Sequence, residues 1–388
     1  MSLIYLDHAA TTPLDARVRA AMLPWLDDLD GYGNPASDHA PGLRARRAVE
    51  QARAHVAALI GAMPEEMVWT SGATESNNLA LKGALEFRGL ERAHLITTRI
   101  EHKAVLDTCR YLETRGVRVS YLNPDAQGRI APQAVLDALR PETVLVSLMW
   151  VNNETGVINP IEAVAPALRA RGVLLHVDAA QAAGRVGIDL ATTPVDLLSL
   201  SAHKVYGPKG AGALFVRKRP RARLAPQLHG GGHEQGMRSG TLATHQIVGM
   251  GEACRLARQE LVVEGPRLSA LRDRLWRHLQ ALPGVHRNGD PSQTVPALLN
   301  LSFEGVEGEA LRAMLPELAV SSGSACSSAT REPSYVLRAL GRDDELAGAS
   351  LRFSLGRSTT ADQIDRAAGQ VAAAVACLRA LSPLWAVS

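Results

Sequence analysis

Short apolar runs alternate with longer amphipathic segments over most of the chain. An apolar run of four to eight residues between turn residues is typical of a buried strand, whereas apolar residues at every third or fourth position are typical of a helix. This pattern predicts strands at 4–6, 67–70, 94–98, 117–121, 143–151, 173–178, 197–201 and 213–216. It predicts helices at 14–30, 42–60, from the turn at 71–76 to about 88, and at 103–115, 132–139 and 161–171.

The pattern changes after a glycine-rich break at 230–232. Two long helices are predicted at 242–259 and 264–282, followed by strands at 298–303, 319–321 and 351–355 and helices at 309–315 and 360–381. Repeated strand–helix units favour an α/β fold with a mostly parallel, mixed sheet covered by helices, and the C-terminal pattern favours a smaller α+β domain. We therefore predict a large domain at 16–262 and a small domain formed by 1–15 and 263–388.

Charge and hydropathy argue against a protein that binds nucleic acids or membranes. The 388 residues include 42 Lys and Arg and 39 Asp and Glu, so a net charge of +3 predicts no direct nucleic-acid partner and no strong attraction to membranes. The N-terminus lacks a signal-peptide pattern, and the longest apolar run, near 144–151, is too short to span a bilayer, which predicts a cytoplasmic protein. A basic run at 217–223 is either an exposed turn or a docking patch for an acidic partner.

Four cysteines, none in CxxC spacing, argue against a disulfide framework or a structural zinc site. We expect Cys109, Cys254 and Cys377 to be core residues on helices. Cys326 differs because it lies among nine small residues at 321–329. Such a segment is either a linker with an incidental cysteine or a mobile, exposed arm with a reactive thiol, and we favour the reactive thiol.

One pair of histidines raises the question of a metal. His229 and His233 have the HxxxH spacing that can chelate a metal on a helix, but the three glycines between them argue against a helix. We therefore predict no metal site.

The strongest chemical signal lies at 196–210, where a buried strand delivers Ser201, His203 and Lys204 into a Gly/Pro-rich loop. A lysine at a strand end is either a solvated loop residue or a nucleophile that forms a Schiff base with an aldehyde cofactor. The residues at the other predicted strand ends favour the second of these two interpretations of Lys204.

Four of those strand ends carry groups that a pyridoxal phosphate site would use. Thr74 and neighbouring backbone N–H groups begin a helix, which suits a phosphate or an ordinary helix cap. Asp178 could hold a pyridine nitrogen in its protonated form or cap a turn, and His102 could stack on a ring and move protons. Two amides, Asn152 and Asn153, follow a buried strand, where they need a ligand or a turn as hydrogen-bond partner.

A series of motifs in order along almost the whole chain resembles the cysteine desulfurases of the IscS/NifS type, which are class V aminotransferase-like, fold-type I pyridoxal phosphate (PLP) enzymes. The motifs are Y-L-D-H-A-A-T-T-P, G-N-P-A-S, T-S-G-A-T-E-S-N-N, E-H-K-A-V-L, V-N-N-E-T-G, H-V-D-A-A-Q, S-A-H-K-V-Y-G-P-K-G, H-G-G-G-H-E-Q-G-M-R-S-G-T, S-S-G-S-A-C-S-S and R-F-S-L-G-R.

The resemblance implies roles for individual residues toward PLP. Lys204 would bind the cofactor covalently and move protons at the substrate carbon. Asp178 would pair with the pyridine nitrogen, Gln181 with the phenolic oxygen, and His102 would stack on the ring. The phosphate would be held by Ala73, Thr74, Ser201 and His203, with Thr241 reaching in from the second subunit of a homodimer.

The resemblance also implies the reaction. Asn153 and Arg352 would receive the carboxylate of L-cysteine, and Cys326, on a mobile loop at about 321–333, would take its sulfur as a persulfide while alanine is released. The sulfur would pass to iron-sulfur cluster assembly or to the thiolation of tRNA and cofactors. A selenocysteine lyase or another class V PLP enzyme is the alternative.

Two departures from the family pattern carry expectations of their own. The chain stops soon after 385, where IscS-like members continue into a tail that contacts the iron-sulfur scaffold protein, so scaffold docking is not assured. Trp150 stands where some close relatives have histidine, and we expect it to alter the shape of the pocket.

Overall fold

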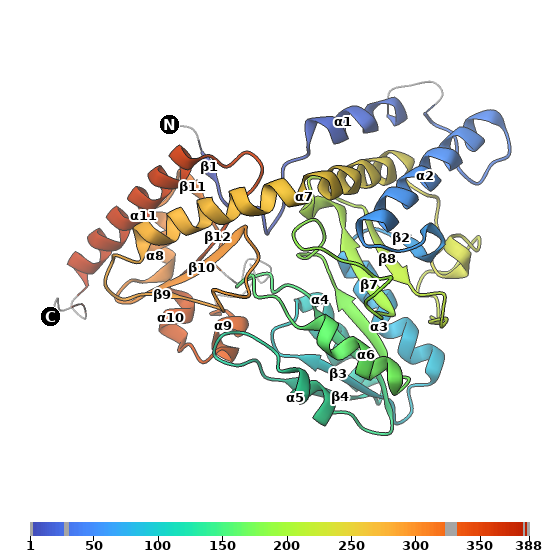
Figure 1. Cartoon of the computed structure of the whole chain (residues 1–388), viewed down its shortest axis with the longest axis horizontal. Coiled ribbons are helices and arrows are strands. Elements are labelled where there is room, and N and C mark those ends of the chain that lie inside the picture. The colour runs from blue at the N-terminus through green and yellow to red at the C-terminus, as the bar shows by residue number, and fades with distance from the viewer. Residues whose placement is uncertain (1–2, 27–30, 323–331, 383–384, 386–388) are drawn as a thin grey trace.

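A seven-stranded mixed sheet organises the larger part of the molecule (Figure 1). The computed structural model describes residues 3–26, 31–322, 332–382 and 385. The strand order is β2-β8-β7-β6-β5-β3-β4, and β8 runs antiparallel to both of its neighbours while all other pairs are parallel. The strands are β2 (Met67–Thr70), β3 (His94–Thr98), β4 (Arg118–Leu122), β5 (Thr143–Met149), β6 (Leu174–Asp178), β7 (Leu197–Ser201) and β8 (Gly212–Val216).

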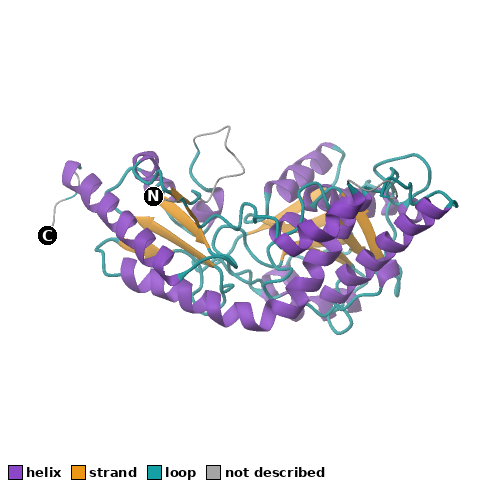
Figure 2. Cartoon of the chain, turned by 90° about the horizontal axis from the view of Figure 1, so that it is seen from above, coloured by secondary structure: helices purple, strands orange, loops and turns teal. Residues whose placement is uncertain are grey.

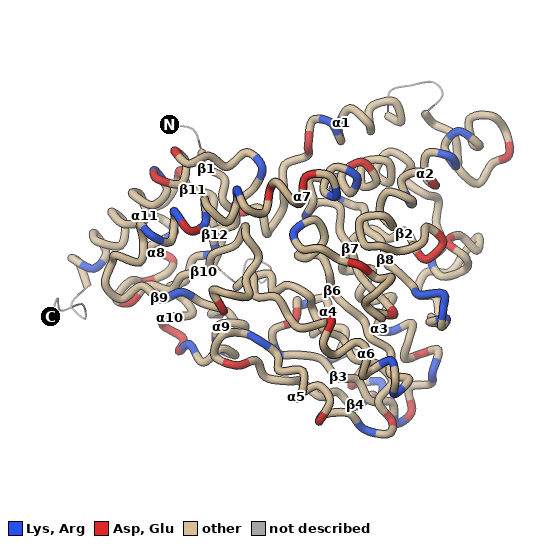
Figure 3. The backbone as a smooth tube through the Cα atoms, viewed as in Figure 1, with Lys and Arg blue, Asp and Glu red and all other residues tan. Residues whose placement is uncertain are grey.

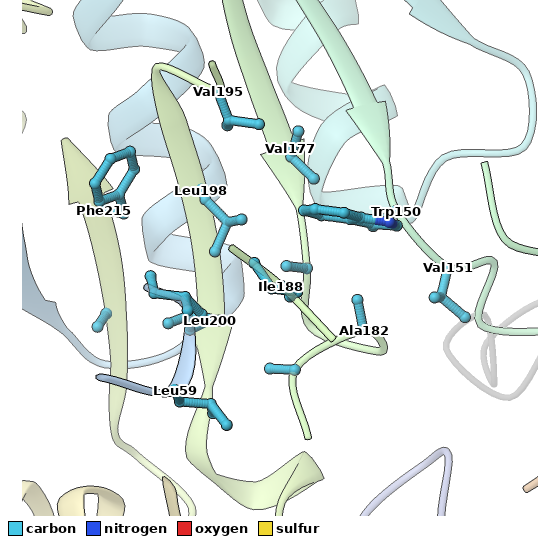
Figure 4. Packing of buried hydrophobic residues seen from close by; sticks show 14 of the residues in the cluster. Leu59, Trp150, Val151, Val177, Ala182, Ile188, Val195, Leu198, Leu200 and Phe215 are labelled. Carbon is cyan, nitrogen blue, oxygen red and sulfur yellow. The ribbon is translucent and has the colours of Figure 1, made fainter. Parts of the chain in front are cut away.

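Helices cover both faces of this sheet, as predicted for an α/β fold. The apolar residues of α3 (Ala73–Arg88) and α4 (Lys103–Thr114) pack on one face. On the other face lie α2 (Ala40–Leu59), α5 (Pro132–Asp137), α6 (Ile161–Ala170) and α7 (Thr244–Leu279), and α1 (Ala16–Met22) lies against α7. Figure 4 shows the tight apolar packing of this second face around Val177, Leu198, Leu200 and Phe215.

A second, smaller group of strands lies at the opposite end of the molecule (Figures 1 and 2). It joins a three-stranded antiparallel sheet, in the order β12-β10-β9, to a parallel pair of short strands, β1 and β11. This arrangement agrees with the predicted α+β part. Its elements are β1 (Ile4–Tyr5), β9 (Val285–Arg287), β10 (Leu298–Phe303), β11 (Leu318–Ala319), β12 (Ser350–Ser354), α8 (Gly308–Ala313), α9 (Tyr335–Ala339), α10 (Asp344–Gly348) and α11 (Ala361–Leu381).

Helix α7 joins the two groups and differs from the prediction. The sequence predicted two helices separated near 260–263, but one helix runs through this stretch with Pro266 inside it. A proline removes one intrahelical hydrogen bond, and here the packing of α7 on α2 at one end and on α11 at the other outweighs that local cost. The predicted domain limit at 262 therefore falls within a continuous helix, and the domain boundaries stay a prediction.

Two smaller predictions also need correction. The helix predicted at 14–30 ends at Met22 and continues as a short 3-10 turn, Leu23–Trp25, because Pro24 cannot extend the α-helical hydrogen bonds. Cys109 and Cys254 are buried as expected, but Cys377 is exposed on α11. The small residues around it gave a misleading apolar stripe.

The surface agrees with the balanced composition. Lys and Arg lie among Asp and Glu over both parts of the molecule in the view of Figure 3. In the basic run, Arg217 donates hydrogen bonds to the carbonyls of Val195 and Leu190, and Lys218 and Arg221 form a β-bridge that closes a turn after β8. No helix within the described residues is long and apolar enough to cross a membrane.

Candidate active site

A cavity of about 540 Å³ lies beyond the carboxyl ends of β5, β6 and β7, at the beginning of α3. Ligand sites in sheets of this kind are expected at that edge, and the volume is in the range of small-molecule sites. All predicted site residues within the described part of the chain line this cavity except Thr241, and Cys326 lies outside that part. The predicted residues that line it are Ala73, Thr74, His102, Asn153, Asp178, Gln181, Ser201, His203, Lys204 and Arg352.

Lys204 follows β7 in a short 3-10 turn, Ala202–Lys204, and is partly buried. Its Nζ donates to the carbonyl oxygens of Ala9 (2.5 Å) and Ala10 (2.7 Å). These carbonyls belong to the loop after β1, so the N-terminal segment holds the amine at the cavity. The amine is therefore fixed in a polar environment near the ends of β6 and β7.

Asp178 is the last residue of β6 and is buried. Its Oδ1 accepts from the backbone N–H of Ala180 (3.0 Å), and its Oδ2 accepts from Nδ2 of Asn77 (2.8 Å), which lies on α3. Both carboxylate oxygens thus accept hydrogen bonds from neutral donors. This geometry fixes the carboxylate at the cavity wall.

The beginning of α3 faces the same cavity through Ala73 and Thr74. The residue before the helix, Gly72, provides no side chain to cap the first N–H groups. The first turn of an uncapped helix is a ready site for an anion such as a phosphate. A side chain at Gly212 would meet Gly72 Cα at 2.4 Å, so glycine is required where β8 passes this turn.

His203 lies beside this helix end and its Nδ1 is 3.1 Å from the hydroxyl of Thr11. Burial, together with the nearby positive charges of Lys204 and Lys209, lowers the pKa of His203 to about 4. The imidazole is therefore neutral near pH 7 and can accept or donate a hydrogen bond at a ligand.

His102 caps α4, and its Nδ1 accepts from the backbone N–H of Ala104 (3.1 Å). In the neutral ring this leaves the proton on Nε2. The preceding residue, Glu101, is fully buried, and its Oε1 accepts from the N–H of Met149 and the hydroxyl of Thr98. Burial, opposed by these hydrogen bonds and helped by the charge of Asp178, raises the pKa of Glu101 to about 8.

Arg352 lies on β12, so a residue from the smaller group of strands also lines the cavity. Its side chain is buried and donates to the carbonyl oxygen of Asn153 (2.8 Å) and to Oδ1 of Asp7 (2.8 Å). The backbone of Arg352 also pairs with Ser321, where the described chain leads into the segment that carries Cys326. Arg352 thus joins the cavity to the start of that segment.

Gln181 and Asn153 also reach the cavity with their amides. Nε2 of Gln181 donates to the carbonyl oxygen of Ala9 (2.8 Å), and its Oε1 accepts from Arg185. Oδ1 of Asn153 is buried without a hydrogen-bond partner among the described residues. A buried amide oxygen of this kind is available to a donor group on a ligand.

Two predicted residues, Thr241 and Trp150, lie away from the cavity, and a third, Cys326, is not described. Thr241 is exposed in the loop before α7 and does not line the cavity, and Cys326 lies outside the described residues. Trp150 does not line the cavity either, which contradicts the expectation that it alters the pocket. It packs in the apolar core on the other side of the sheet (Figure 4), because β5 ends at Met149 and the next side chain points to the opposite face.

Sequence reasoning missed several contributors. The carbonyl groups of Ala9 and Ala10 carry no side-chain signal, although the turn-rich loop at 7–13 marked an unusual backbone. Lys209 lines the cavity as a second lysine and was treated only as part of a glycine-rich motif. Asn77 does not line the cavity but lies within the T-S-G-A-T-E-S-N-N motif.

The cavity fits PLP in the chemistry of its donors. It combines a partly buried lysine amine, a buried carboxylate and an uncapped helix beginning, which match the aldehyde, the pyridine nitrogen and the phosphate of that cofactor. Within the described residues there is no group of three or more His, Cys, Asp or Glu side chains arranged for a metal ion.

Comparisons with known proteins agree with this chemistry. The cysteine desulfurase IscS of Stutzerimonas stutzeri is 58% identical over 383 residues, which cover 98% of this chain and 95% of that protein. Among solved structures, a NifS-like protein superposes with a TM-score of 0.89 at 35% identity, covering 97% of this chain and 99% of the other. A structure described as SspA in complex with cysteine gives a TM-score of 0.78 at 39% identity, covering 90% and 98%.

These similarities confirm the resemblance that the motifs indicated and the fold-type I architecture that it implied. The family model for class-V aminotransferases matches residues 4–367, which include both groups of strands and the whole cavity lining. The chain therefore belongs to the aminotransferase class-V family of pyridoxal phosphate enzymes.

Proposed function

We propose that this protein is a cysteine desulfurase that removes the sulfur of L-cysteine, releases L-alanine and holds the sulfur as a persulfide on Cys326. The observation that carries the proposal is the convergence of Lys204, Asp178 and Arg352 on one cavity from different parts of the chain. If these residues had only structural roles, their side chains would not be expected to line the same cavity.

The residues that would hold PLP are those that fit its chemical groups. Lys204 would bind the aldehyde carbon, Asp178 would hold the pyridine nitrogen in its protonated form, and His102 would stack on the ring. When bound, the cofactor supplies an electron sink that allows the carbon–sulfur bond of the substrate to break. The phosphate would be held by Ala73, Thr74, Ser201 and His203, the phenolic oxygen by Gln181, with Thr241 contributed by the second subunit of a homodimer.

Lys204 is also the proposed proton carrier at the substrate Cα. The carbonyls of Ala9 and Ala10 hold its amine in the cavity, where it can take a proton from that carbon and return one to the alanine product. These carbonyls are acceptors only, so they orient the amine without competing for its task as a base.

Arg352 is the proposed partner of the substrate carboxylate. The guanidinium offers five N–H donors, and those given to Asp7 and Asn153 leave Nε buried without a partner among the described residues. A carboxylate that approaches this group would make charge-assisted hydrogen bonds, with the amide of Asn153 beside it. This pairing would select amino-acid substrates with a free α-carboxylate.

Chain connectivity supports the role of Cys326. Ser321 pairs with the backbone of Arg352, and five residues of extended chain reach at most about 18 Å. The short tether of five residues from Ser321 to Cys326 supports the proposal that the Cys326 thiolate accepts the substrate sulfur at the cavity. The same tether would let the persulfide pass to an acceptor, which we propose is an iron-sulfur scaffold protein or a carrier for the thiolation of tRNA, in the cytoplasm.

The decisive experiment is an anaerobic incubation of the PLP-loaded protein with L-cysteine and a reducing thiol, in which sulfide and alanine are measured together. We expect equal amounts of both from the wild type and from Cys377→Ser, which removes the exposed thiol on α11. Cys326→Ser should lose sulfide release while it still binds cysteine. Unchanged sulfide release by Cys326→Ser excludes the thiol role, and a preference for selenocysteine with release of selenide moves the assignment to a selenocysteine lyase.

A further inference from the structure

Asn77 interrupts the apolar side of α3. Along the same side of this helix, Ala80, Leu81 and Ala84 are buried against the sheet, as expected for residues three, four and seven positions further on. Asn77 is 1% exposed at the head of this stripe, where the helical pattern calls for an apolar side chain. A polar residue at such a position needs a specific reason.

The hydrogen bonds of Asn77 point to Asp178. Its Nδ2 donates to Oδ2 of Asp178 at 2.8 Å, whereas its Oδ1 is buried without a partner among the described residues. The orientation of the amide is fixed by chemistry, because an ionised carboxylate accepts hydrogen bonds only and must face the NH₂ group. The amide therefore makes one charge-assisted bond and leaves its own carbonyl unsatisfied.

The amide of Asn77 gives Asp178 a hydrogen bond but leaves a buried carbonyl without a partner among the described residues, so it benefits the carboxylate more than the stability of the fold. A buried unsatisfied carbonyl lowers the stability of the fold, and an alanine or leucine at position 77 would continue the apolar stripe without that cost. Asp178 gains a second tether, since Ala180 N–H holds Oδ1 and Asn77 holds Oδ2. With both oxygens held and about four acceptor positions in total, the carboxylate keeps free capacity for a donor in the cavity.

We propose that Asn77 is a positioning residue that orients the Asp178 carboxylate toward the pyridinium N–H of the cofactor. The inference rests on the proposed function, because it takes Asp178 as the partner of that nitrogen. Asn77 does not line the cavity, so it acts through Asp178 and not by touching the cofactor or the substrate.

Asn77→Ala tests the proposal, with Asn159→Ala as the matched control. Asn159 is also a buried amide with an unpartnered Oδ1, but its Nδ2 donates to the carbonyl of Met149 (2.9 Å) and not to Asp178. Two readouts are the dissociation constant of PLP and the ¹⁵N chemical shift of bound PLP labelled at the pyridine nitrogen. We expect Asn77→Ala to weaken PLP binding about ten- to a hundredfold and to move the shift toward the unprotonated value, with neither change in Asn159→Ala.

The double variant separates the possible outcomes. If Asn77 acts only through Asp178, Asn77→Ala should have no further effect on PLP affinity in an Asp178→Ala background. Equal effects of Asn77→Ala and Asn159→Ala, or an Asn77→Ala effect that persists in that background, overturn the proposal. An Asp178→Ala variant that binds PLP like the wild type overturns the role of Asp178 as well, whereas sulfide release is tested separately and does not bear on Asn77.

Discussion

The same strands of the seven-stranded sheet present opposite kinds of residues on their two faces. On β6, His176 and Asp178 point toward α3, while Val177 between them packs under α7 and its neighbours. On β7, Ser199 lies on the α3 side, and Leu198 and Leu200 lie on the other (Figure 4). The apolar face is a continuous core, and the α3 face becomes polar toward the carboxyl ends of the strands.

The buried ionisable side chains of the polar face that lie near Asp178 are mostly uncharged near neutral pH. The ring of His176 lies between the hydroxyls of Ser147 (2.8 Å) and Ser199 (3.0 Å), and burial lowers its pKa to about 4. Glu101, with its raised pKa, is the other buried ionisable group near Asp178. Around neutral pH this leaves the region with few charges, so an electrostatic contact of Asp178 is strong in this low-dielectric setting.

The apolar face contributes mainly to the stability of the fold, whereas the α3 face combines an apolar cluster with polar groups at the carboxyl ends of the strands that carry the chemistry. Polar positions on the α3 face are expected to change cofactor properties more than stability, and apolar positions on the opposite face should do the reverse. Each substitution below tests one side of that contrast.

Asp178→Asn should have the largest effect. It keeps the shape of the side chain but removes the charge, so we expect the rate of sulfide release to fall about a hundred- to a thousandfold with a small change in unfolding temperature. Val177→Ala, the neighbouring residue on the opposite face, should lower stability by roughly 2 kcal/mol with near-normal turnover. Similar turnover in Asp178→Asn and wild type contradicts the division between the faces.

Leu198→Ala tests the apolar face directly. Leu198 is a residue of β7 whose side chain is fully buried in the apolar core. Removing that side chain should lower the free energy of unfolding by about 2–5 kcal/mol. Because Leu198 does not line the cavity, the absorbance spectrum of the bound cofactor should not change. Denaturant titration and the spectrum together check this, and an altered spectrum in a folded variant shows that the faces are coupled.

Glu101→Gln should have a smaller effect that depends on pH. The pKa of Glu101 is about 8 in the folded protein and lower in the unfolded chain, so the unfolded state loses this proton first as pH rises. Wild-type stability therefore falls through this group from about pH 4.5 to about pH 8. Glutamine cannot titrate, so between about pH 5 and pH 7 the difference in unfolding free energy should shift by roughly 2 kcal/mol in favour of the variant. A pH-independent difference between variant and wild type shows that Glu101 is ionised in the folded protein.

The elements that form the site were predictable because apolar strands and the turns after them leave strong local signals. Lys204, Asp178 and Thr74 each follow or end a short apolar run, and parallel strands bring such ends together. The continuous α7 was not predictable, because the local signal of Pro266 indicates a break and only packing on two distant helices maintains the helix.

Positions that act through backbone or through a second residue were also missed. The carbonyls of Ala9 and Ala10 depend on the path of a loop, which side-chain chemistry does not encode. The partnership of Asn77 with Asp178 joins residues 101 positions apart and appears only when α3 packs on β6. Trp150 lies on the same face as Val146 and Leu148 because side chains alternate along the strand, and the motif alone does not tell which face meets the cavity.

Two lysines of the described residues line the cavity, Lys204 and Lys209, and only Lys204 is the proposed attachment point of the cofactor. The most direct measurement is borohydride reduction of the PLP-loaded protein followed by peptide mass spectrometry to locate the attached pyridoxyl group. We expect attachment at Lys204 alone, which is lost in Lys204→Ala and kept in Lys209→Ala. Attachment at Lys209, or none at Lys204 in a protein that retains PLP, would contradict the central claim that the residues at the ends of β6 and β7 form the active site.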